Sequence, residues 1–292
     1  MLIDWPFRSV RFRVHPCFWL VVVPTVWSGY FLEVVTLFGL ILIHELGHVS
    51  VARHFGWRMT EIELLPFGGV AKTDEWGTVP AKEEMLVAIA GPAFNGIVVV
   101  FGAGCYLFGW WDTEWAQFFV TANMWLAGFN LLPIIPLDGG RILQVFLSYR
   151  FPFRTCITSS HLISFTLSFG MLAVSVIPFA YGGPPLFNVG VIACFLMMSN
   201  AFMWYQKHYQ FMRFLIQRQV DDVPKERPVF PLLVSHCDTV QSTIRRWKKE
   251  AYHVMVVRDD SGKVLRVLPE ERLLDYFLAT PSPRATIGDL LD

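Results

Sequence analysis

The chain has 292 residues, of which 54% are hydrophobic and 16% charged, with zero formal net charge and a mean hydropathy of +0.44. Soluble domains carry about 25% charged residues, so the composition excludes an ordinary soluble protein and predicts a membrane protein. Zero net charge argues against binding to nucleic acid. Roughly the last 80 residues are more polar than the rest, which predicts a membrane domain followed by a small soluble one.

Six apolar segments follow one another along residues 1–206. The five unbroken segments are roughly 17–25 residues long, the length that a hydrocarbon core of about 30 Å requires. We therefore expect an α-helical membrane domain with six transmembrane helices. The expected spans are residues 14–30, 31–55, 85–107, 115–147 with an internal break, 159–179 and 186–204. The scattered cysteines form no C-x-x-C pair and predict single apolar fillers, not disulfides or a thiolate metal site; they are Cys17, Cys105, Cys156, Cys194 and Cys237.

The second expected span contains an H-E-x-x-H motif formed by His44, Glu45 and His48. Residues four apart share one face of a helix, so both imidazoles can reach one ion, with Glu45 beside it as a candidate general base. A chance match is the alternative. Ionisable groups are costly inside a bilayer, however, and usually mark function there. The motif therefore predicts a catalytic metal site within the membrane.

A catalytic zinc site usually takes three protein ligands and a water, so the motif needs a third ligand. Asp138 is the candidate, because it is the only acidic residue in residues 116–149 and follows a segment broken by Pro133 and Pro136. Irregular backbone within a membrane is tolerated only where protein buries it or where it lines a wet cavity. The alternative for Asp138 is an ordinary Asp-Gly turn. The competing third ligands are Glu61, Glu63, Glu83 and Glu84.

Two further features lie inside the expected spans. Asn130 precedes the break, where it could cap the helix, bond a neighbouring helix, or hold the substrate backbone or the oxyanion. Spacing alone leaves these roles open. Gly91, Pro92 and Asn95 interrupt the third span and predict close helix packing.

Lys and Arg predict the orientation of the spans. The loops near residues 29–33, 109–114 and 180–185 contain neither residue type, whereas the segments on the opposite side are all basic. By the positive-inside rule, both termini should be cytoplasmic. His44 lies nine residues before Arg53, which places it about 13 Å below the cytosolic edge at 1.5 Å per residue.

Residues 207–228 form a basic linker, and residues 229–292 are expected to form a small α/β cytosolic domain. Its predicted elements are a strand from residue 229, a helix (239–250), a strand (253–257), a turn (259–262), a strand (264–268) and a helix (270–279).

Three motifs together resemble the site-2 protease family of intramembrane zinc metalloproteases. They are H-E-L-G-H at residues 44–48, G-P-x-x-N at residues 91–95 and N-x-x-P-x-x-P-L-D-G-G at residues 130–140. The resemblance implies zinc held by His44, His48 and Asp138. It also implies that Glu45 activates a water and that Asn130 contacts the substrate.

Six spans with a short cytosolic tail are similar to the sporulation branch of that family, in endospore-forming bacteria. That resemblance implies cleavage of the inactive pro-sigma-K factor, inhibitory membrane-protein partners, and a location in the mother-cell membrane surrounding the forespore.

A membrane helix must unwind before hydrolysis, because its amides are bonded within the helix. The strand pattern at residues 61–65 and the turn and return at residues 67–70 predict a short membrane-associated β-hairpin. Such a hairpin could hold the unwound substrate as an added strand. We therefore expect Leu64 and Gly68 to be substrate-binding residues.

The β-α-β-β-α order of residues 229–292 resembles a single CBS motif, a module that usually works in pairs and often binds adenine nucleotides such as ATP. The resemblance implies a homo-oligomer paired through this domain. Pro269 and Arg272 depart from the family's nucleotide-binding pattern, which often has Thr and a ribose-binding Asp at these positions.

Three classes of function follow from these patterns. The first is a zinc-dependent intramembrane endopeptidase that acts on a membrane-associated regulatory protein, and the family resemblance favours it. The second is a transporter or channel with a non-hydrolytic metal or proton site. The third is a nucleotide-sensing membrane regulator.

Overall fold

The computed structural model describes residues 11–14, 16–65, 68–73, 75–220, 227–279, 282 and 284–291. The chain forms two compact units. The first contains the residues up to Leu143 together with Ile163–Asn200, and the second contains Gln144–Leu162 together with the residues from Ala201 onward. The second unit thus joins two separate pieces of the chain. The domain boundaries predicted at residues 206 and 228 treat each domain as one continuous piece, so they assign Gln144–Leu162 to the membrane domain.

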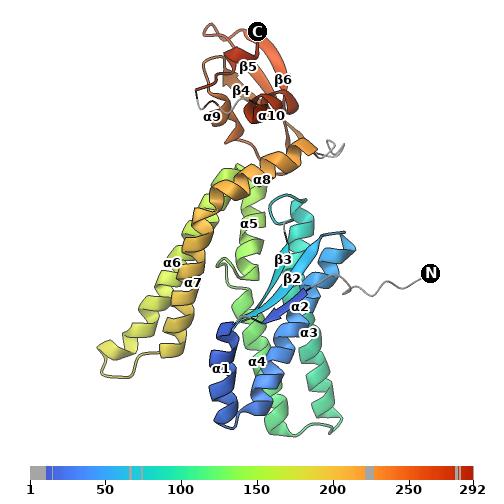
Figure 1. Ribbon diagram of the computed structural model, residues 1–292, viewed down its shortest axis with the longest axis vertical. Helices are drawn as coiled ribbons and strands as arrows, with labels where there is room; N and C mark the ends of the chain where they lie inside the picture. Colours follow the sequence, from blue (N-terminus) through green and yellow to red (C-terminus); the bar gives the residue numbers. More distant parts are fainter. Residues whose placement is uncertain are drawn as a thin grey trace, which may run out of the picture. The chain divides into compact units, whose positions relative to one another are not determined.

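The first unit combines long helices with a small sheet (Figure 1). Its helices are α1 (Pro16–Trp27), α2 (Phe31–His54), α3 (Ala81–Leu107), α4 (Thr113–Asn130), the start of α5 (Asp138–Arg150), and most of α6 (Phe153–Ala180) and α7 (Phe187–Tyr205). Its strands are β1 (Arg11–Val14), β2 (Met59–Leu65) and β3 (Gly68–Thr73).

Among the described residues, four helices are long and apolar enough to cross a membrane: α2, α3, α6 and α7. Two of the six expected spans fall short of that standard. Helix α1 has 12 residues and contains Pro24, and α4 has 18 residues with a polar, buried Asn123 within it. Length and composition therefore identify four spans, and the count of six stays a prediction.

The sheet adds one strand to the expected hairpin. Strands β2 and β3 form the predicted antiparallel hairpin, but β1 pairs with β2 in parallel on the other side, so the order is β1-β2-β3. Leu64 lies opposite Val14 on one side and Gly69 on the other. Both sides of β2 are thus paired within the described sheet, so a substrate strand cannot add directly beside Leu64, and a role of Leu64 in binding substrate stays a prediction. Within the described strands, the free edge beside the hairpin belongs to β3, which begins at Gly68.

The break between α4 and α5 is buried by protein, as its position required. Ile134 and Ile135 are 2% and 1% exposed. Ser164 of α6 accepts a hydrogen bond from the Ile135 amide at 2.9 Å, and Asn200 of α7 donates to the Ile135 carbonyl at 2.6 Å. A side chain at Gly140 would lie 2.5 Å from the Ile134 carbonyl carbon, so glycine lets the start of α5 pack against this segment.

The second unit contains the predicted β-α-β-β-α order. Its elements are α8 (Lys207–Val220), β4 (Val229–Ser235), α9 (Val240–Ile244), β5 (Tyr252–Arg258), β6 (Val264–Pro269), α10 (Glu270–Ala279) and η1 (Gly288–Leu290). Strand β4 pairs with β5 in parallel, and β5 pairs with β6 antiparallel. Helix α9 is shorter than the expected 239–250, because the chain turns after Arg245 and buries Trp247 completely in the core.

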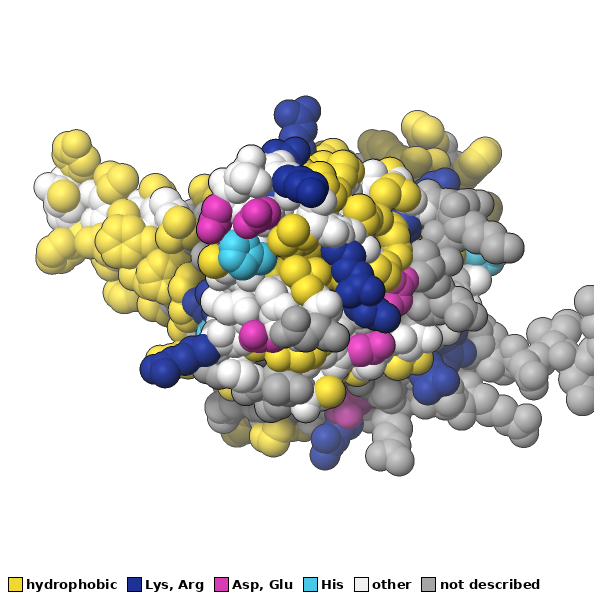
Figure 2. All heavy atoms as spheres, turned by 90° about the horizontal axis from the view of Figure 1, so that it is seen from above, with side chains coloured by type: hydrophobic (Ala, Val, Ile, Leu, Met, Phe, Trp, Pro, Cys, Tyr) yellow, Lys and Arg dark blue, Asp and Glu magenta, His cyan; other side chains and the backbone are white. Residues whose placement is uncertain are grey.

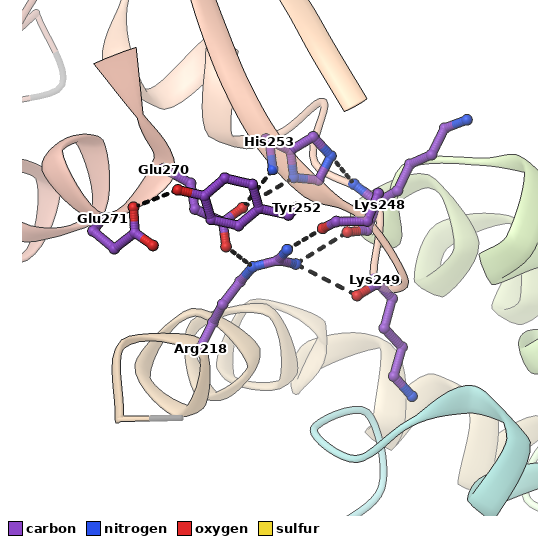
Figure 3. Close-up of polar contacts among 8 residues, drawn as sticks. Arg218, Lys248, Lys249, Tyr252, His253, Glu270 and Glu271 are labelled. Atoms are coloured by element: carbon purple, nitrogen blue, oxygen red, sulfur yellow. Dashed lines mark hydrogen bonds and ion pairs between the residues drawn. The ribbon is translucent and has the colours of Figure 1, made fainter. Parts of the chain in front are cut away.

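Arg218 of α8 binds the C-terminal elements through a buried polar network (Figure 3). Its Nε bonds Glu270 Oε1 at 2.8 Å, and its terminal nitrogens donate to the carbonyls of Lys248 and Ala251. Glu270 Oε2 also accepts from the His253 amide at 2.8 Å. Burial raises the pKa of Glu270, but the hydrogen bonds from His253 and Arg218 and the charge of Arg218 outweigh burial and hold that pKa below its usual value.

Replacement of Arg218 by alanine should destabilise the second unit by about 3–5 kcal/mol, because it leaves the Glu270 carboxylate buried without its cation. The measurement is thermal unfolding and amide hydrogen exchange of β5 and α10 in the full chain. Gln219→Ala, at the next residue of α8, is the matched control. It removes an exposed hydrogen bond to Asp275 and should change the free energy of unfolding by less than about 0.5 kcal/mol. Equal effects of the two variants would contradict a structural role for the Arg218 network.

Candidate active site

The structure brings the three predicted metal ligands together. His44 and His48 lie one turn apart on α2, 3% and 7% exposed, and Asp138 is the first residue of α5. Asp138 Oδ2 lies 3.1 Å from His44 Nε2, and Asp138 Oδ1 lies 3.2 Å from His48 Nε2. The two Nε2 atoms are 3.2 Å apart. Three side chains from two distant helices thus converge on one point.

These residues fit a zinc ion. Bonds of about 2.0–2.1 Å at tetrahedral angles separate ligand atoms by about 3.3 Å, close to the three distances observed. His48 Nδ1 lies 2.7 Å from the Val87 carbonyl. A carbonyl can only accept, so Nδ1 carries the proton and Nε2 presents its lone pair to the centre of the cluster.

Helix α3 packs directly against the ligand histidines at Gly91. A Cβ at this position would overlap His48 Nε2 and lie 2.8 Å from His44 Cε1. At another contact between the same two helices, a Cβ at Gly47 of α2 would lie 2.8 Å from the carbonyl oxygen of Ala90 on α3. The predicted close packing of the third span is therefore confirmed at Gly91, where it closes one side of the site.

Glu45 lies beside the ligands and against strand β3. It is 6% exposed and lines the same cavity as the cluster. A Cβ at Gly69 would lie 2.5 Å from Glu45 Cγ. Strand β3 therefore passes directly over the candidate base, and glycine permits that approach.

The cavity that contains these groups has a volume of about 180 Å³. Asn130 also lines it, and its side-chain amide donates to the Leu126 carbonyl of its own helix at 3.1 Å. Its role in binding substrate stays a prediction. The remaining lining residues are Ile41, Trp57, Met59, Gly69, Thr73, Trp76, Val87, Leu126, Phe129, Pro136, Leu137, Arg141 and Phe195.

Sequence reasoning missed the aromatic and cationic part of this lining. Arg141 lies with its guanidinium carbon 4.9 Å from the centre of the Trp76 ring, and Trp76 packs edge-on against Trp57 with ring centres 5.2 Å apart. Arg141 follows Asp138 by three residues on α5, so helical spacing could have placed it at the site. The two tryptophans carried no such signal.

The competing acidic residues are engaged elsewhere. Glu61 forms an ion pair with Arg13 at 3.6 Å. Glu83 accepts a hydrogen bond from Trp57 Nε1 at 2.9 Å, and Glu84 accepts one from the Gly77 amide. Of the carboxylates whose side chains are described, only Asp138 joins the two histidines; the side chains of Glu63 and Leu64 lie outside the described residues.

A His-His-Asp cluster with an adjacent glutamate, in which both histidines and the glutamate lie on a helix long enough to cross a membrane, is the arrangement of a membrane metallopeptidase. Residues 32–111 and 109–173 match the profile of peptidase family M50. The chain is also 30% identical over 296 residues to Stage IV sporulation protein FB of Bacillus subtilis (strain 168), covering 98% of each chain. It therefore belongs to peptidase family M50, the site-2 proteases, and is a metalloendopeptidase of the membrane. Of the three classes that the residues left open, the enzyme is the one supported.

Two matches from Methanocaldococcus jannaschii extend the comparison. The chain is 34% identical over 151 residues to Zinc metalloprotease MJ0392 of Methanocaldococcus jannaschii, covering 49% of this chain and 44% of that protein. The structure resembles that of a Site-2 Protease from Methanocaldococcus jannaschii with a TM-score of 0.54 and 25% identity. That match covers 68% of this chain and 92% of the other. The family of zinc metalloproteases implies Zn²⁺ as the cofactor.

Replacement of Gly91 by alanine should displace His48 and lower both the zinc content and the cleavage rate of the enzyme by about tenfold or more. Gly96→Ala on the same helix is the matched control, because a Cβ there has nothing within 4 Å. Zinc analysis and a cleavage assay of both purified variants check this. If Gly91→Ala kept as much zinc as Gly96→Ala, the close approach of α3 to the ligands would not exist in the active protein.

Proposed function

We propose that this protein is a zinc-dependent intramembrane endopeptidase that performs regulated proteolysis of a membrane-associated regulatory protein. His44, His48 and Asp138 hold the zinc, and Glu45 is the general base. The convergence of these four side chains around one cavity carries the proposal. The long apolar helix that bears three of them supports hydrolysis within the membrane.

The chain's own groups supply binding, orientation and proton transfer. When bound, zinc acts as a Lewis acid on the scissile carbonyl and lowers the pKa of a water beside it. Glu45 accepts the proton of the attacking water and returns it to the leaving amine. The Val87 carbonyl holds the His48 ring in place. Asn130 binds the substrate backbone at the rim of the same cavity.

The membrane arrangement that we propose has six spans, with α1 and α4 added to the four helices that meet the length and composition standard. Both termini are cytoplasmic. The alternation of basic and uncharged loops along the sequence supports this orientation. The site then lies within the membrane, nearer its cytosolic face.

The substrate that we propose is pro-sigma-K. Similarity to Stage IV sporulation protein FB along 98% of both chains supports this choice. With that substrate come a mother-cell membrane location around the forespore and inhibitory membrane-protein partners.

The substrate binds as an added strand on β3. Strand β2 is already paired on both sides, whereas β3 passes over Glu45 and has its outer edge available within the described sheet. An extended peptide paired along this edge would present its amides beside the general base. Gly68 is the first residue of β3 and therefore of this edge.

The C-terminal domain pairs with a second copy through its sheet. Leu232, Met255 and Leu268 lie opposite one another across the three strands, and their side chains are buried on one face of the sheet. The next residues along β4 and β6 toward the other face, Leu233 and Val267, are 50% and 55% exposed. An apolar outer sheet face of this kind supports a homo-oligomer. Binding of an adenine nucleotide to this CBS-like domain stays a prediction.

Replacement of Glu45 by glutamine should lower cleavage by about 10²–10⁴-fold while the zinc content stays at the wild-type level, because the base is lost and the ligands are kept. The assay follows pro-sigma-K cleavage by the purified enzyme, with metal analysis of the same samples. Glu114→Gln, at an exposed position in the first turn of α4, is the control and should cleave normally. Product formation by Glu45→Gln at the wild-type rate would contradict the proposed base.

Proline substitutions at Val70 and Ala71 should separate the two edges of β3, because neighbouring residues in a strand direct their amides to opposite sides. One variant removes an amide bonded to β2 and lowers thermal stability. The other removes only an outward amide, so it should keep stability yet lose most cleavage. Ala71→Ser, which keeps the amide, is the control. Normal cleavage by the stable proline variant would exclude strand addition at β3.

A further inference from the structure

A second group of side chains able to bind a metal lies in the second unit, which contains none of the four active-site residues His44, Glu45, His48 and Asp138. His236 and Cys237 follow β4, and Asp260 follows β5. Because β4 and β5 are parallel, their carboxyl ends meet at the same edge of the sheet. Three chemically different ligand types, from two separate loops, are therefore brought to one place.

The distances suit one ion. Cys237 Sγ lies 3.2 Å from His236 Nε2, and the three ligand atoms lie within 4.8 Å of one another. A zinc ion with bonds of about 2.3 Å to sulfur and 2.0 Å to nitrogen separates those two atoms by about 3.5 Å. Asp260 Oδ1 lies 4.0 Å from the other ring nitrogen, His236 Nδ1, and its side chain is 83% exposed. One ion takes only one of the two ring nitrogens, so the Asp260 carboxylate must turn to reach an ion held between Nε2 and the Cys237 sulfur.

The two loops that present these ligands are held by backbone hydrogen bonds. Gly288 of η1 donates to the His236 carbonyl at 2.8 Å. Asp238 accepts from the Ser235 amide at 2.9 Å and fixes the turn around Cys237. The hairpin that carries Asp260 is closed by the Asp259 amide bonding the Lys263 carbonyl at 2.9 Å. The ligands therefore start from a fixed scaffold, which lowers the entropy lost on binding.

An ion from solvent can reach these side chains, because the Asp260 side chain is 83% exposed. Figure 2 shows a histidine side chain beside acidic side chains on the face that it views. Cys237 is a free, exposed cysteine. The sequence interpretation of all five cysteines as single apolar fillers overlooked this one, because Asp260 is distant along the chain.

We propose that His236, Cys237 and Asp260 form a second, surface metal site that binds a zinc-class ion, with water completing the coordination. Thiolate and imidazole ligands select zinc and related soft or borderline ions over magnesium and calcium. Because the site is open to solvent, it exchanges its ion more readily than the buried cluster on α2 and α5. It does not depend on the proposed peptidase mechanism.

The test uses the full chain, purified in detergent and freed of metal. Zinc is added, the protein is treated with a thiol-alkylating reagent, and modification of each cysteine is measured by mass spectrometry. Zinc should slow modification of Cys237 by about fivefold or more, because a coordinated thiolate is a poor nucleophile. Cys194, exposed on α7, is the internal reference and should be unaffected. His236→Gln and Asp260→Asn should each remove the protection.

Cobalt gives an independent readout. A thiolate-to-cobalt absorption band should appear in the wild type and in a His44→Ala/His48→Ala double variant, which retains the second site, and should be absent from Cys237→Ser. Thermal unfolding of each variant verifies its fold. If zinc fails to protect Cys237 in the wild type, or if His236→Gln and Asp260→Asn leave the protection unchanged, the second site does not exist.

Discussion

The structure depends on keeping three ionisable side chains satisfied in an apolar interior. A charged or unpaired polar group away from water is costly, and burial is tolerated when partners surround it. His44, His48 and Asp138 face one another at 3.1–3.2 Å, so one cation satisfies all three. A metal bound at this cluster would therefore stabilise the fold as well as supply chemistry.

The broken segment before Asp138 follows from the same constraint. To place a carboxylate opposite two histidines of another helix, the chain must interrupt α4 and begin α5 inside the protein. The interruption exposes backbone groups that a continuous helix would have satisfied. Ser164 and Asn200 bond both polar groups of Ile135, and they come from helices that take no direct part in metal binding. Helices α6 and α7 are therefore structural supports of the third ligand.

The convergence of the three candidate metal ligands was predictable from the sequence, whereas the surroundings of the site were not. His44 and His48 share a helix face by local spacing, and Asp138 was the sole acidic residue beside a proline-broken stretch. By contrast, β1 has four residues, and its parallel pairing with β2 joins segments about 50 positions apart. The sequence alone indicates only the hairpin of β2 and β3, so it does not exclude β2 as the strand to which a substrate adds. Trp57 and Trp76 likewise reach the cavity through tertiary packing, which leaves no periodic trace in the sequence.

The hydrophobic core of the second unit has a consequence for how separable the C-terminal domain is. Phe153 and Ile157 from the start of α6, and Phe214 and Leu215 from α8, are buried in one cluster with the residues of the C-terminal sheet. A polypeptide cut after residue 228 would leave those four side chains without their cover. The C-terminal domain therefore has a hydrophobic core in common with α8 and the start of α6. An exchange of this domain between relatives must include α8 and the start of α6.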